Sequence, residues 1–330
     1  MAQRVTIKSI AQDLGISHMT VSRALTNHPS VRAETRKAIL ERARELGYVK
    51  SAAATAMRGD ATGIIGLLLP NIVNEFYARF ANALALACEP HGIQVITHLT
   101  NDDQKREAHA LLRLREVQAD SVVLVPAPGE PDVVTNRYLE DMQVVQLIRQ
   151  RTGLPEAACL LLEDVTAIGA AVDRLAANGH DRIAYIGAHT ALSSGRERLS
   201  AFRNAMRRNG MEPLPELVQT SPPSFEMGRR SAGRILHGPE AATALVCGGF
   251  EISNGALETC LRHGVNFPEG LAFIGYGDPS FYEWIQGGIS TVSLPVDDLA
   301  RCTAELLSRG QTEDHKTVSL PAELIIRSSG

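Results

Sequence analysis

The sequence lacks any continuous apolar run of about 18 residues, the length that a membrane-spanning helix needs. It contains only five cysteines, an odd number, and no two of them form a Cys-x-x-Cys pair. We therefore expect small, buried, reduced side chains at Cys88, Cys159, Cys247, Cys260 and Cys302. Because Met1–Arg4 run directly into the first predicted helix, we expect no signal peptide and a cytoplasmic location.

Motifs of common enzyme classes are also missing. The sequence has no P-loop, no Gly-x-Gly-x-x-Gly after a strand, no Gly-x-Ser-x-Gly turn and no His-Glu-x-x-His. Its ten histidines show no metal-ligand spacing, and His180, which follows Gly179 at a predicted helix end, is interpreted as structural. These absences predict a protein that is not an enzyme and that uses neither a metal ion nor a cofactor.

The charge is distributed unevenly along the chain. The net charge of −4 taken alone argues against a nucleic-acid-binding protein. However, residues 1–59 carry ten Lys and Arg against four Asp and Glu, a net charge of +6, while the remainder carries 23 against 33. A basic N-terminal part on an acidic body is typical of a protein whose polyanionic partner contacts one end only.

The N-terminal stretch Val5–Tyr48 predicts three short helices. Thr6 and Ser17 carry hydroxyls that are suited to capping the first and second helix, and Gly15 provides the tight turn between them. Apolar residues recur at helical spacing in each segment, which predicts helices over about residues 6–14, 18–25 and 33–46. Two helices joined by a short turn that contains glycine form the helix-turn-helix unit.

The second of these helices presents polar side chains away from the predicted core. In a helix-turn-helix unit this helix offers its N-terminal side chains to the edges of DNA bases. Hydroxyls, an imidazole and a guanidinium are all able to reach bases or phosphates. A three-helix core fragment with a solvated polar face is the alternative interpretation. The outward side chains are His18, Met19, Thr20, Ser22 and Arg23.

An alanine-rich segment, residues 50–62, follows the head. It predicts two turns of a helix that is too short to be stable alone in water, followed by a linker. Such an element is suited to a transition between order and disorder. Met57 is its one large apolar side chain. Either Met57 inserts between base steps in the minor groove, or it packs on the body.

From Gly63 onward, continuous apolar strands alternate with helices, a pattern typical of parallel sheets covered on both faces. Two such series predict an α/β body, residues 63–330, made of two doubly wound subdomains. We assign residues 63–158 and 290–315 to the first subdomain, and residues 159–289 and 316–330 to the second. In this class ligands bind beyond the carboxyl ends of strands, which predicts a cleft between the halves.

The whole chain resembles the lactose-repressor (LacI/GalR) family of bacterial transcription regulators. The head carries VTIKSIAQDLGISHMTVSRAL and ETRKAILERARELGYV, which are highly specific for this family. The body carries GIIGLLLPNIVNEFYA, GHDRIAYIG, RLSAFRNAM and LAFIGYGD, which are less specific because sugar-binding periplasmic proteins share that fold. The run GYGD also resembles the gluconate-repressor branch. The resemblance implies a periplasmic-binding-protein-like body and a homodimer on pseudo-palindromic, double-stranded operator DNA.

The resemblance also implies roles for individual residues. His18 and Met19 would read bases, Arg23 would contact a base or phosphate, and Met57 would stand where the family usually has a leucine that opens the minor groove. Phosphate-holding residues would be Thr6, Ser17, Thr20 and Ser22. The set of residues that we predict to contact DNA is Thr6, Ser17, His18, Met19, Thr20, Ser22, Arg23, Asn27 and Met57.

For the cleft, the resemblance implies effector contacts from Phe76, Tyr77, Arg149, Arg198 and Asp278. For both arginines a structural ion pair is the alternative. The sequence departs from the family where Asn-Asp is usual, at Gly249-Phe250, and where the first Asp after the Gly-aromatic pair has become Gly277. A further departure is Pro223, at a position that is often aromatic. Because these losses remove partners for sugar hydroxyls, and because arginine binds oxyanions, we expect an acidic small-molecule effector, such as a sugar acid.

Three functions were weighed on these grounds. A ligand-switched repressor accounts for both the head and the cleft. A solute-binding module of a transport system would need an export signal and would have no use for a helix-turn-helix head. An enzyme on a doubly wound fold lacks its motifs, and fold alone does not decide function. The sequence therefore predicts a repressor.

Overall fold

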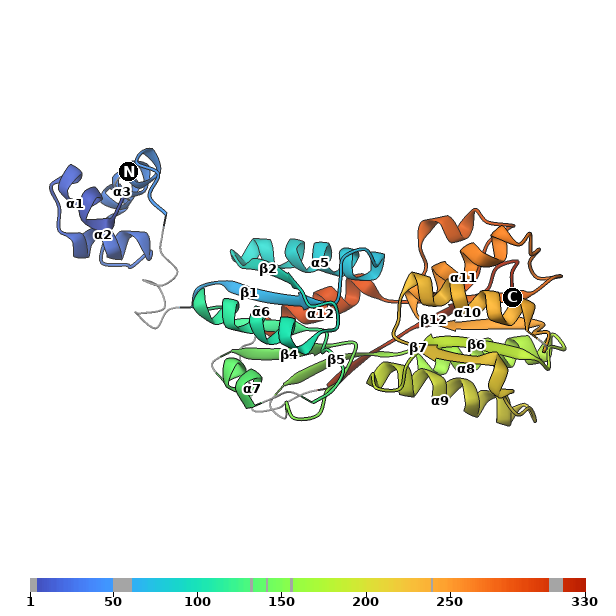
Figure 1. Ribbon diagram of the computed structural model, residues 1–330. Coiled ribbons are helices and arrows are strands. Elements are labelled where there is room, and N and C mark those ends of the chain that lie inside the picture. Colours follow the sequence, from blue (N-terminus) through green and yellow to red (C-terminus); the bar gives the residue numbers. More distant parts are fainter. Residues whose placement is uncertain are drawn as a thin grey trace. The chain divides into compact units, whose positions relative to one another are not determined.

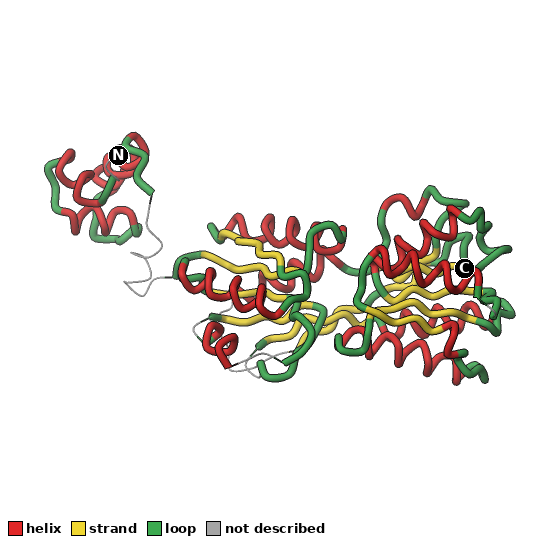
Figure 2. Tube along the Cα trace, in the orientation of Figure 1, coloured by secondary structure: helices red, strands yellow, loops and turns green. Residues whose placement is uncertain are grey.

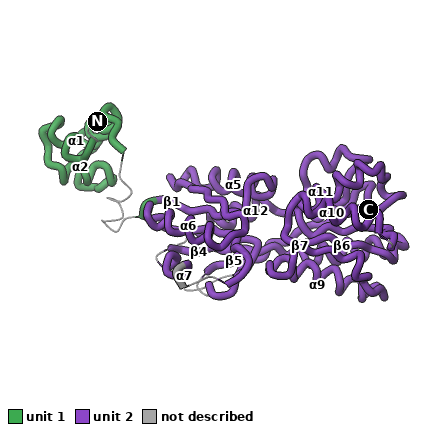
Figure 3. Tube along the Cα trace, viewed as in Figure 1, with its two compact units in different colours: residues 1–62 green, residues 63–330 purple. Residues whose placement is uncertain are grey.

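The computed structural model describes residues 5–49, 61–130, 133–140, 142–154, 157–238, 240–308 and 317–330. The chain divides into two compact units, Met1–Thr62 and Gly63–Gly330, which we call the head and the body (Figure 3). Residues 50–60, with the predicted hinge helix and Met57, lie outside the described residues. Among the described residues, no helix is both long and apolar enough to cross a membrane.

The head is the predicted three-helix unit. It contains α1 (Ile7–Leu14), α2 (His18–Leu25) and α3 (Ala33–Glu45). The apolar residues that predicted the helices pack together in one small core, since the helical spacing places them on the inward face of each helix. The buried members of this core are Ile10, Ala11, Val21, Ala24, Val31, Ile39 and Ala43.

The body contains two six-stranded sheets with helices on both faces, as the alternating pattern predicted (Figures 1 and 2). The first sheet has the order β11-β5-β4-β3-β1-β2, and the second has the order β12-β10-β9-β8-β6-β7. Every neighbouring pair is parallel except β10 and β12. The first sheet is built from β1 (Ile64–Leu69), β2 (Gln94–Leu99), β3 (Ser121–Leu124), β4 (Gln143–Leu147), β5 (Ala158–Glu163) and β11 (Thr317–Pro321). The second is built from β6 (Ile183–Ala188), β7 (Val218–Ser221), β8 (Ala244–Gly248), β9 (Ala272–Tyr276), β10 (Ser290–Ser293) and β12 (Glu323–Ile325).

The helices of the body pack in pairs. In the first subdomain α5 (Glu75–Cys88) packs on α12 (Val296–Ser308), and α6 (Gln104–Glu116) packs on α7 (Val133–Leu139). In the second subdomain the pairs are α8 (Val165–Ala177) with α9 (Ser193–Arg208), and α10 (Phe225–His237) with α11 (Phe250–Arg262). The described part of the body also has short 3₁₀ helices at Glu89–His91, Pro215–Leu217 and Ser280–Glu283.

The boundary between the two subdomains differs from the one that we predicted. Strand β5 belongs to the first sheet rather than the second, and β10 belongs to the second rather than the first. The tail, predicted as one unit, contributes β11 to the first sheet and β12 to the second. The residues of a strand do not state which sheet it joins, because that depends on pairing with neighbouring strands. The chain therefore crosses between the subdomains three times, after β5, after β10 and after β11.

Strand β7 was not predicted. It is an edge strand that pairs with β6 alone, and its sequence, VQTS, has only one apolar residue. An edge strand with one solvated side gives no continuous apolar run, so the pattern that revealed the central strands missed this one.

Helices α10 and α11 approach each other closely at two glycines. A Cβ atom on Gly255 would lie 2.0 Å from the carbonyl oxygen of Phe225, and one on Gly228 would lie 2.1 Å from that of Ile252. We expect Gly255→Ala to lower the free energy of unfolding by about 1–3 kcal/mol, because the backbone must move apart. Urea denaturation measures this change.

The matched control is Gly233→Ala on α10, the helix that packs against α11, where a Cβ atom would meet nothing within 4 Å. There we expect a gain of about 0.5–1 kcal/mol, since alanine favours a helix interior over glycine. Equal stability changes for the two variants would contradict the close approach.

Candidate functional site

Local hydrogen bonds in the head set the start of α1 and α2. The Thr6 hydroxyl accepts from the Ser9 N–H, and the Ser9 hydroxyl accepts from the Thr6 N–H, which is a reciprocal capping box. Ser17 caps α2 by accepting from the Thr20 N–H at 3.1 Å. Gly15 adopts a φ of 63°, the left-handed conformation that the turn requires. The turn between α1 and α2 is therefore encoded locally.

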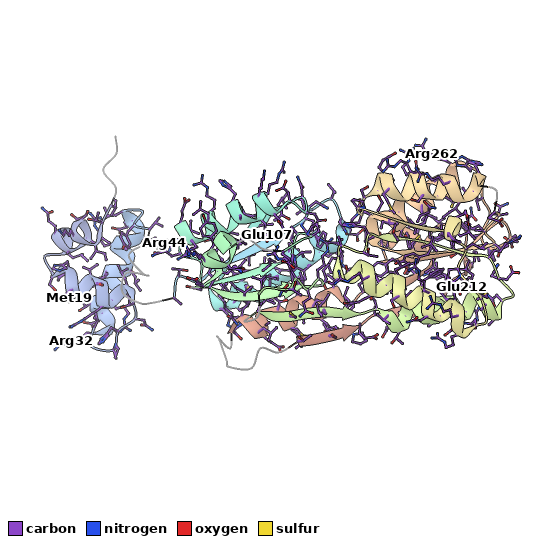
Figure 4. All side chains as sticks on the ribbon, turned by 60° about the horizontal axis from the view of Figure 1, so that its bottom comes forward. Met19, Arg32, Arg44, Glu107, Glu212 and Arg262 are labelled. Atoms are coloured by element: carbon purple, nitrogen blue, oxygen red, sulfur yellow. The ribbon has the colours of Figure 1, made fainter. Side chains whose placement is uncertain are left out.

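The outer surface of α2 is exposed and polar. His18 and Arg23 are exposed, and the Met19 side chain projects from the surface of the head with 52% of its area exposed (Figure 4). Thr20 and Ser22 are half-buried, and the Thr20 hydroxyl also bonds to Ser17. A capped helix with exposed donors at its N-terminal half is able to enter a major groove.

Long side chains from α3 brace this arrangement. Arg42 donates to Asp13 on α1 at 2.6 Å, and Arg36 donates to the carbonyl oxygens of His28 and Val31 in the loop after α2. Asn27, in the same loop, has a φ of 56°, a conformation that asparagine tolerates better than most residues. The side chains of α3 thereby hold α1 and the loop after α2 in fixed positions against α3.

A cleft lies between the two subdomains of the body, at the carboxyl ends of the strands. It encloses about 680 Å³ of space outside protein atoms, part of it open to solvent. Its lining includes Asn71 after β1, Asp102 after β2 and Arg149 after β4 from the first subdomain. From the second subdomain it includes Gly248 at the end of β8 and Tyr276 at the end of β9.

Arg149 reaches the cleft from a strained turn. Ile148 has a φ of 52°, which is unfavourable for a β-branched residue, and the Arg149 N–H donates to the Leu147 carbonyl oxygen at 2.6 Å. The Arg149 side chain is buried and donates from Nη1 to Asp102 Oδ1 at 2.5 Å. Asp102 follows β2 with a φ of 55°. Two unusual backbone conformations therefore bring a guanidinium and a carboxylate together at the wall of the cleft, as is common at functional sites.

Arg198 forms a second buried ion pair. Its Nε lies 2.6 Å from Asp164 Oδ2, and its guanidinium stacks over the Tyr276 ring at 4.4 Å. The Tyr276 hydroxyl donates to the same Asp164 oxygen, and burial raises the pKa of that hydroxyl well above its usual value. Burial alone would lower the pKa of Arg198, but the Asp164 carboxylate raises it, so the guanidinium stays charged. Asp164 lies at the first crossing between the subdomains, directly before α8 of the second.

Two family models match the sequence. Residues 6–51 match the model for bacterial regulatory proteins of the lacI family, and residues 172–330 match that for a periplasmic binding protein-like domain. The chain is 25% identical over 331 residues to the HTH-type transcriptional regulator DegA of Bacillus subtilis (strain 168), over 99% of this chain and 98% of that protein. It is 26% identical over 329 residues to the HTH-type transcriptional repressor CytR of Escherichia coli (strain K12), over 98% of this chain and 96% of that protein. The head is thus similar to bacterial regulatory proteins of the lacI family, and the whole chain is similar to HTH-type transcriptional regulators.

The fold of this protein also matches solved structures. The lac repressor dimer bound to operator and the anti-inducer ONPF aligns with a TM-score of 0.83 and 18% identity, over 99% of each chain. The regulator CelR in complex with cellobiose aligns with a TM-score of 0.73 and 24% identity. The curated relatives are transcriptional regulators rather than enzymes. The described residues of the protein contain no group of three or more His, Cys, Asp or Glu able to hold a metal ion.

Four of the five residues predicted to contact the effector line one cleft: Phe76, Tyr77, Arg149 and Arg198. Both aromatic rings are mainly buried in the core of the first subdomain and meet edge to face at 5.4 Å. Asp278 is not among the residues that line this cleft, and its carboxylate accepts two hydrogen bonds of 2.8 and 3.0 Å from Arg327. Its contact with an effector stays a prediction.

The departures at Phe250 and Gly277 form one packing unit. Gly277 has a φ of 84°, and a Cβ atom there would lie 2.1 Å from the Phe250 ring. The ring also packs against the core of the first subdomain and lines the cleft. Phe250 therefore occupies space that a side chain at position 277 would need.

Sequence reasoning missed three acids at or beside the cleft. Asp102 and Asp164 each neutralise one predicted arginine, and Glu251 lines the cleft, where burial raises its pKa. Asp102 stands three positions after β2 ends at Leu99, and Asp164 directly follows β5. That position was the available signal, because strand ends meet at the cleft.

Proposed function

We propose that this protein is a repressor that binds a pseudo-palindromic operator as a homodimer. A small metabolite that binds in the cleft either lowers or raises its affinity for the operator. The observation that carries the proposal is the exposed face of α2, with His18, Met19 and Arg23 on a helix whose core and caps are fixed. Support for the dimer on operator DNA comes from the lac repressor, which was solved in that form.

Selection of bound duplexes from a random pool tests this proposal, carried out with and without candidate effectors. We expect enrichment of a two-fold symmetric sequence whose half-sites are spaced by the two heads. Binding should fall steeply as salt rises, because phosphate contacts release counterions. Equal, weak binding to every duplex, with every metabolite tried, would contradict the proposal.

The proposed switch is thermodynamic linkage through the body. An effector that binds both walls of the cleft changes the relation of the two subdomains, and with it the spacing of residues 50–62 across the dimer. Coupling of roughly 1–3 kcal/mol would change operator affinity by about 5–150-fold. The Asp164 network supports this mechanism, because it joins Arg198 and Tyr276 of the second subdomain to the chain where it leaves the first.

We infer that the effector is a small anion, such as a sugar acid, in line with the GYGD run that resembles the gluconate-repressor branch. Arg149 and Arg198 line the cleft, and Gly249-Phe250 stand where the family usually has Asn-Asp, a pair that would hold sugar hydroxyls. Calorimetric titration with sugar acids and with the matching neutral sugars tests this inference. Binding of the neutral sugars alone would overturn it.

Met57 is proposed to act as a lever in the minor groove at the centre of the operator. We expect Met57→Gly to weaken specific operator binding, because an apolar wedge that unstacks a base step is lost. Effector affinity should stay unchanged, since Met57 is distant in sequence from every cleft residue. A gel-shift titration that gives wild-type affinity for the operator would rule out the lever role.

A further inference from the structure

A second cavity adjoins the effector cleft and shares Arg149 and Leu192 with it. It encloses about 570 Å³ outside protein atoms, part of it open to solvent. Its walls are the loop after β3, the segment Arg149–Thr152 after β4, and the start of α9. Three arginines line it, Arg149, Arg151 and Arg196, and we call it the arginine compartment. Among its described lining residues the only acid is Glu130, which is exposed.

Arg151 is a buried cation with unused donors. Its side chain is 5% exposed and contacts Glu107 Oε1 through Nη1 at 2.6 Å. Within the described part of the chain, its Nε and Nη2 have no hydrogen-bond partner. Glu107, which is buried in the first subdomain (Figure 4), also accepts from the Ala127 N–H, so both of its oxygens are engaged. Buried guanidinium donors without partners are costly, and an oxyanion would satisfy them through charge-assisted bonds.

Two further features point to the same ligand chemistry. Helix α9 begins after Leu192, whose side chain makes no capping hydrogen bond, so its first N–H groups need acceptors from elsewhere. Arg196, on the first turns of α9, is exposed and donates to the Thr190 carbonyl oxygen. It makes no ion pair with any described residue. By contrast, Arg149 and Arg198 of the main cleft are each already paired with an aspartate.

We propose that the arginine compartment is an oxyanion subsite that takes the phosphate or carboxylate group of the effector, with Arg151, Arg196 and the start of α9 as its donors. The uncharged part of the effector then lies beside Phe76 and Phe250 in the main cleft. This inference rests on the proposed effector control and names the part of the site that selects for charge.

The test is calorimetric titration of the full-length protein with inorganic phosphate and with acetate, at an ionic strength held constant with chloride. We expect at least one of the two anions to bind, and the one that binds identifies the charged group. Arg196→Glu should weaken that binding by about tenfold or more, because it reverses a charge at the subsite. Arg151→Lys should do the same, since lysine keeps a cation for Glu107 but lacks the planar guanidinium fork.

The matched control is Arg203→Glu, which makes the same charge change on an exposed position of α9 that lines neither cavity. It should leave anion affinity unchanged. Failure of both anions to bind the wild type, or wild-type affinity in Arg196→Glu, would overturn the subsite. If Arg151→Lys fails to fold, Arg196→Glu alone decides. Operator selection by the wild type tests the proposed function separately, so a failure of the oxyanion subsite can be distinguished from a failure of the repressor function.

Discussion

Replacing Arg198 with methionine should lower the free energy of unfolding by about 3–5 kcal/mol, because it leaves Asp164 as a buried carboxylate without its cation. Asp164 is only 3% exposed, and the Tyr276 hydroxyl is the other side-chain donor that the structure shows on its Oδ2. One hydrogen bond from a neutral hydroxyl does not replace a charge-assisted contact of 2.6 Å. Urea denaturation of the full chain, followed by circular dichroism, measures the loss.

The double variant Asp164→Asn/Arg198→Met should recover much of this loss, because it removes both charges together. The exposed control is Arg301→Met on α12, whose pairs with Asp298 and Glu305 lie in solvent. We expect it to change stability by about 1 kcal/mol or less. A loss for Arg198→Met as small as that of the control would show that the buried pair contributes little to the stability of the fold.

Replacing either His18 or Met19 with alanine should weaken binding to the selected operator by about 1–3 kcal/mol per half-site. Both half-sites of a symmetric operator lose the contact, so the expected loss for the dimer is about 2–6 kcal/mol. Binding to unrelated duplex DNA should hardly change, because that binding depends on phosphate contacts. Fluorescence anisotropy with the operator and with a scrambled duplex measures both quantities.

Glu41→Ala provides the comparison for these head variants. Glu41 lies on α3, its side chain is 65% exposed, and it belongs to neither α1 nor α2. We expect wild-type discrimination between operator and scrambled duplex in this variant. Equal discrimination in His18→Ala, Met19→Ala and Glu41→Ala would show that the exposed face of α2 does not read bases.

Local signals predicted the head almost completely. Thr6, Gly15 and Ser17 act within three or four residues of their own positions, and the structure shows each in the predicted capping or turn role. The core positions followed from helical spacing for the same reason. Which of the exposed residues contact DNA stays a prediction, because no local signal distinguishes a base contact from a solvated side chain.

Long-range contacts account for what the sequence analysis missed in the body. Arg149 pairs with Asp102 across 47 positions, and Arg198 pairs with Asp164 across 34, so neither partner could be assigned from spacing. Asp278 was assigned to the cleft by its place after β9, but its carboxylate pairs with Arg327, 49 positions away. The predicted assignment of strands to the two sheets was wrong for the same reason, because strand pairing depends on contacts between residues that are far apart in the sequence.

The three crossings of the chain between the subdomains also determine whether either subdomain can be produced as a separate fragment. The first sheet needs β11 from near the C-terminus, and its helix α5 is covered by α12, which follows the last parallel strand of the second sheet. No single cut of the polypeptide therefore releases either half as a contiguous fragment. A piece that ends before residue 296 would expose the apolar face of α5 and the edge of β5, and should aggregate rather than fold.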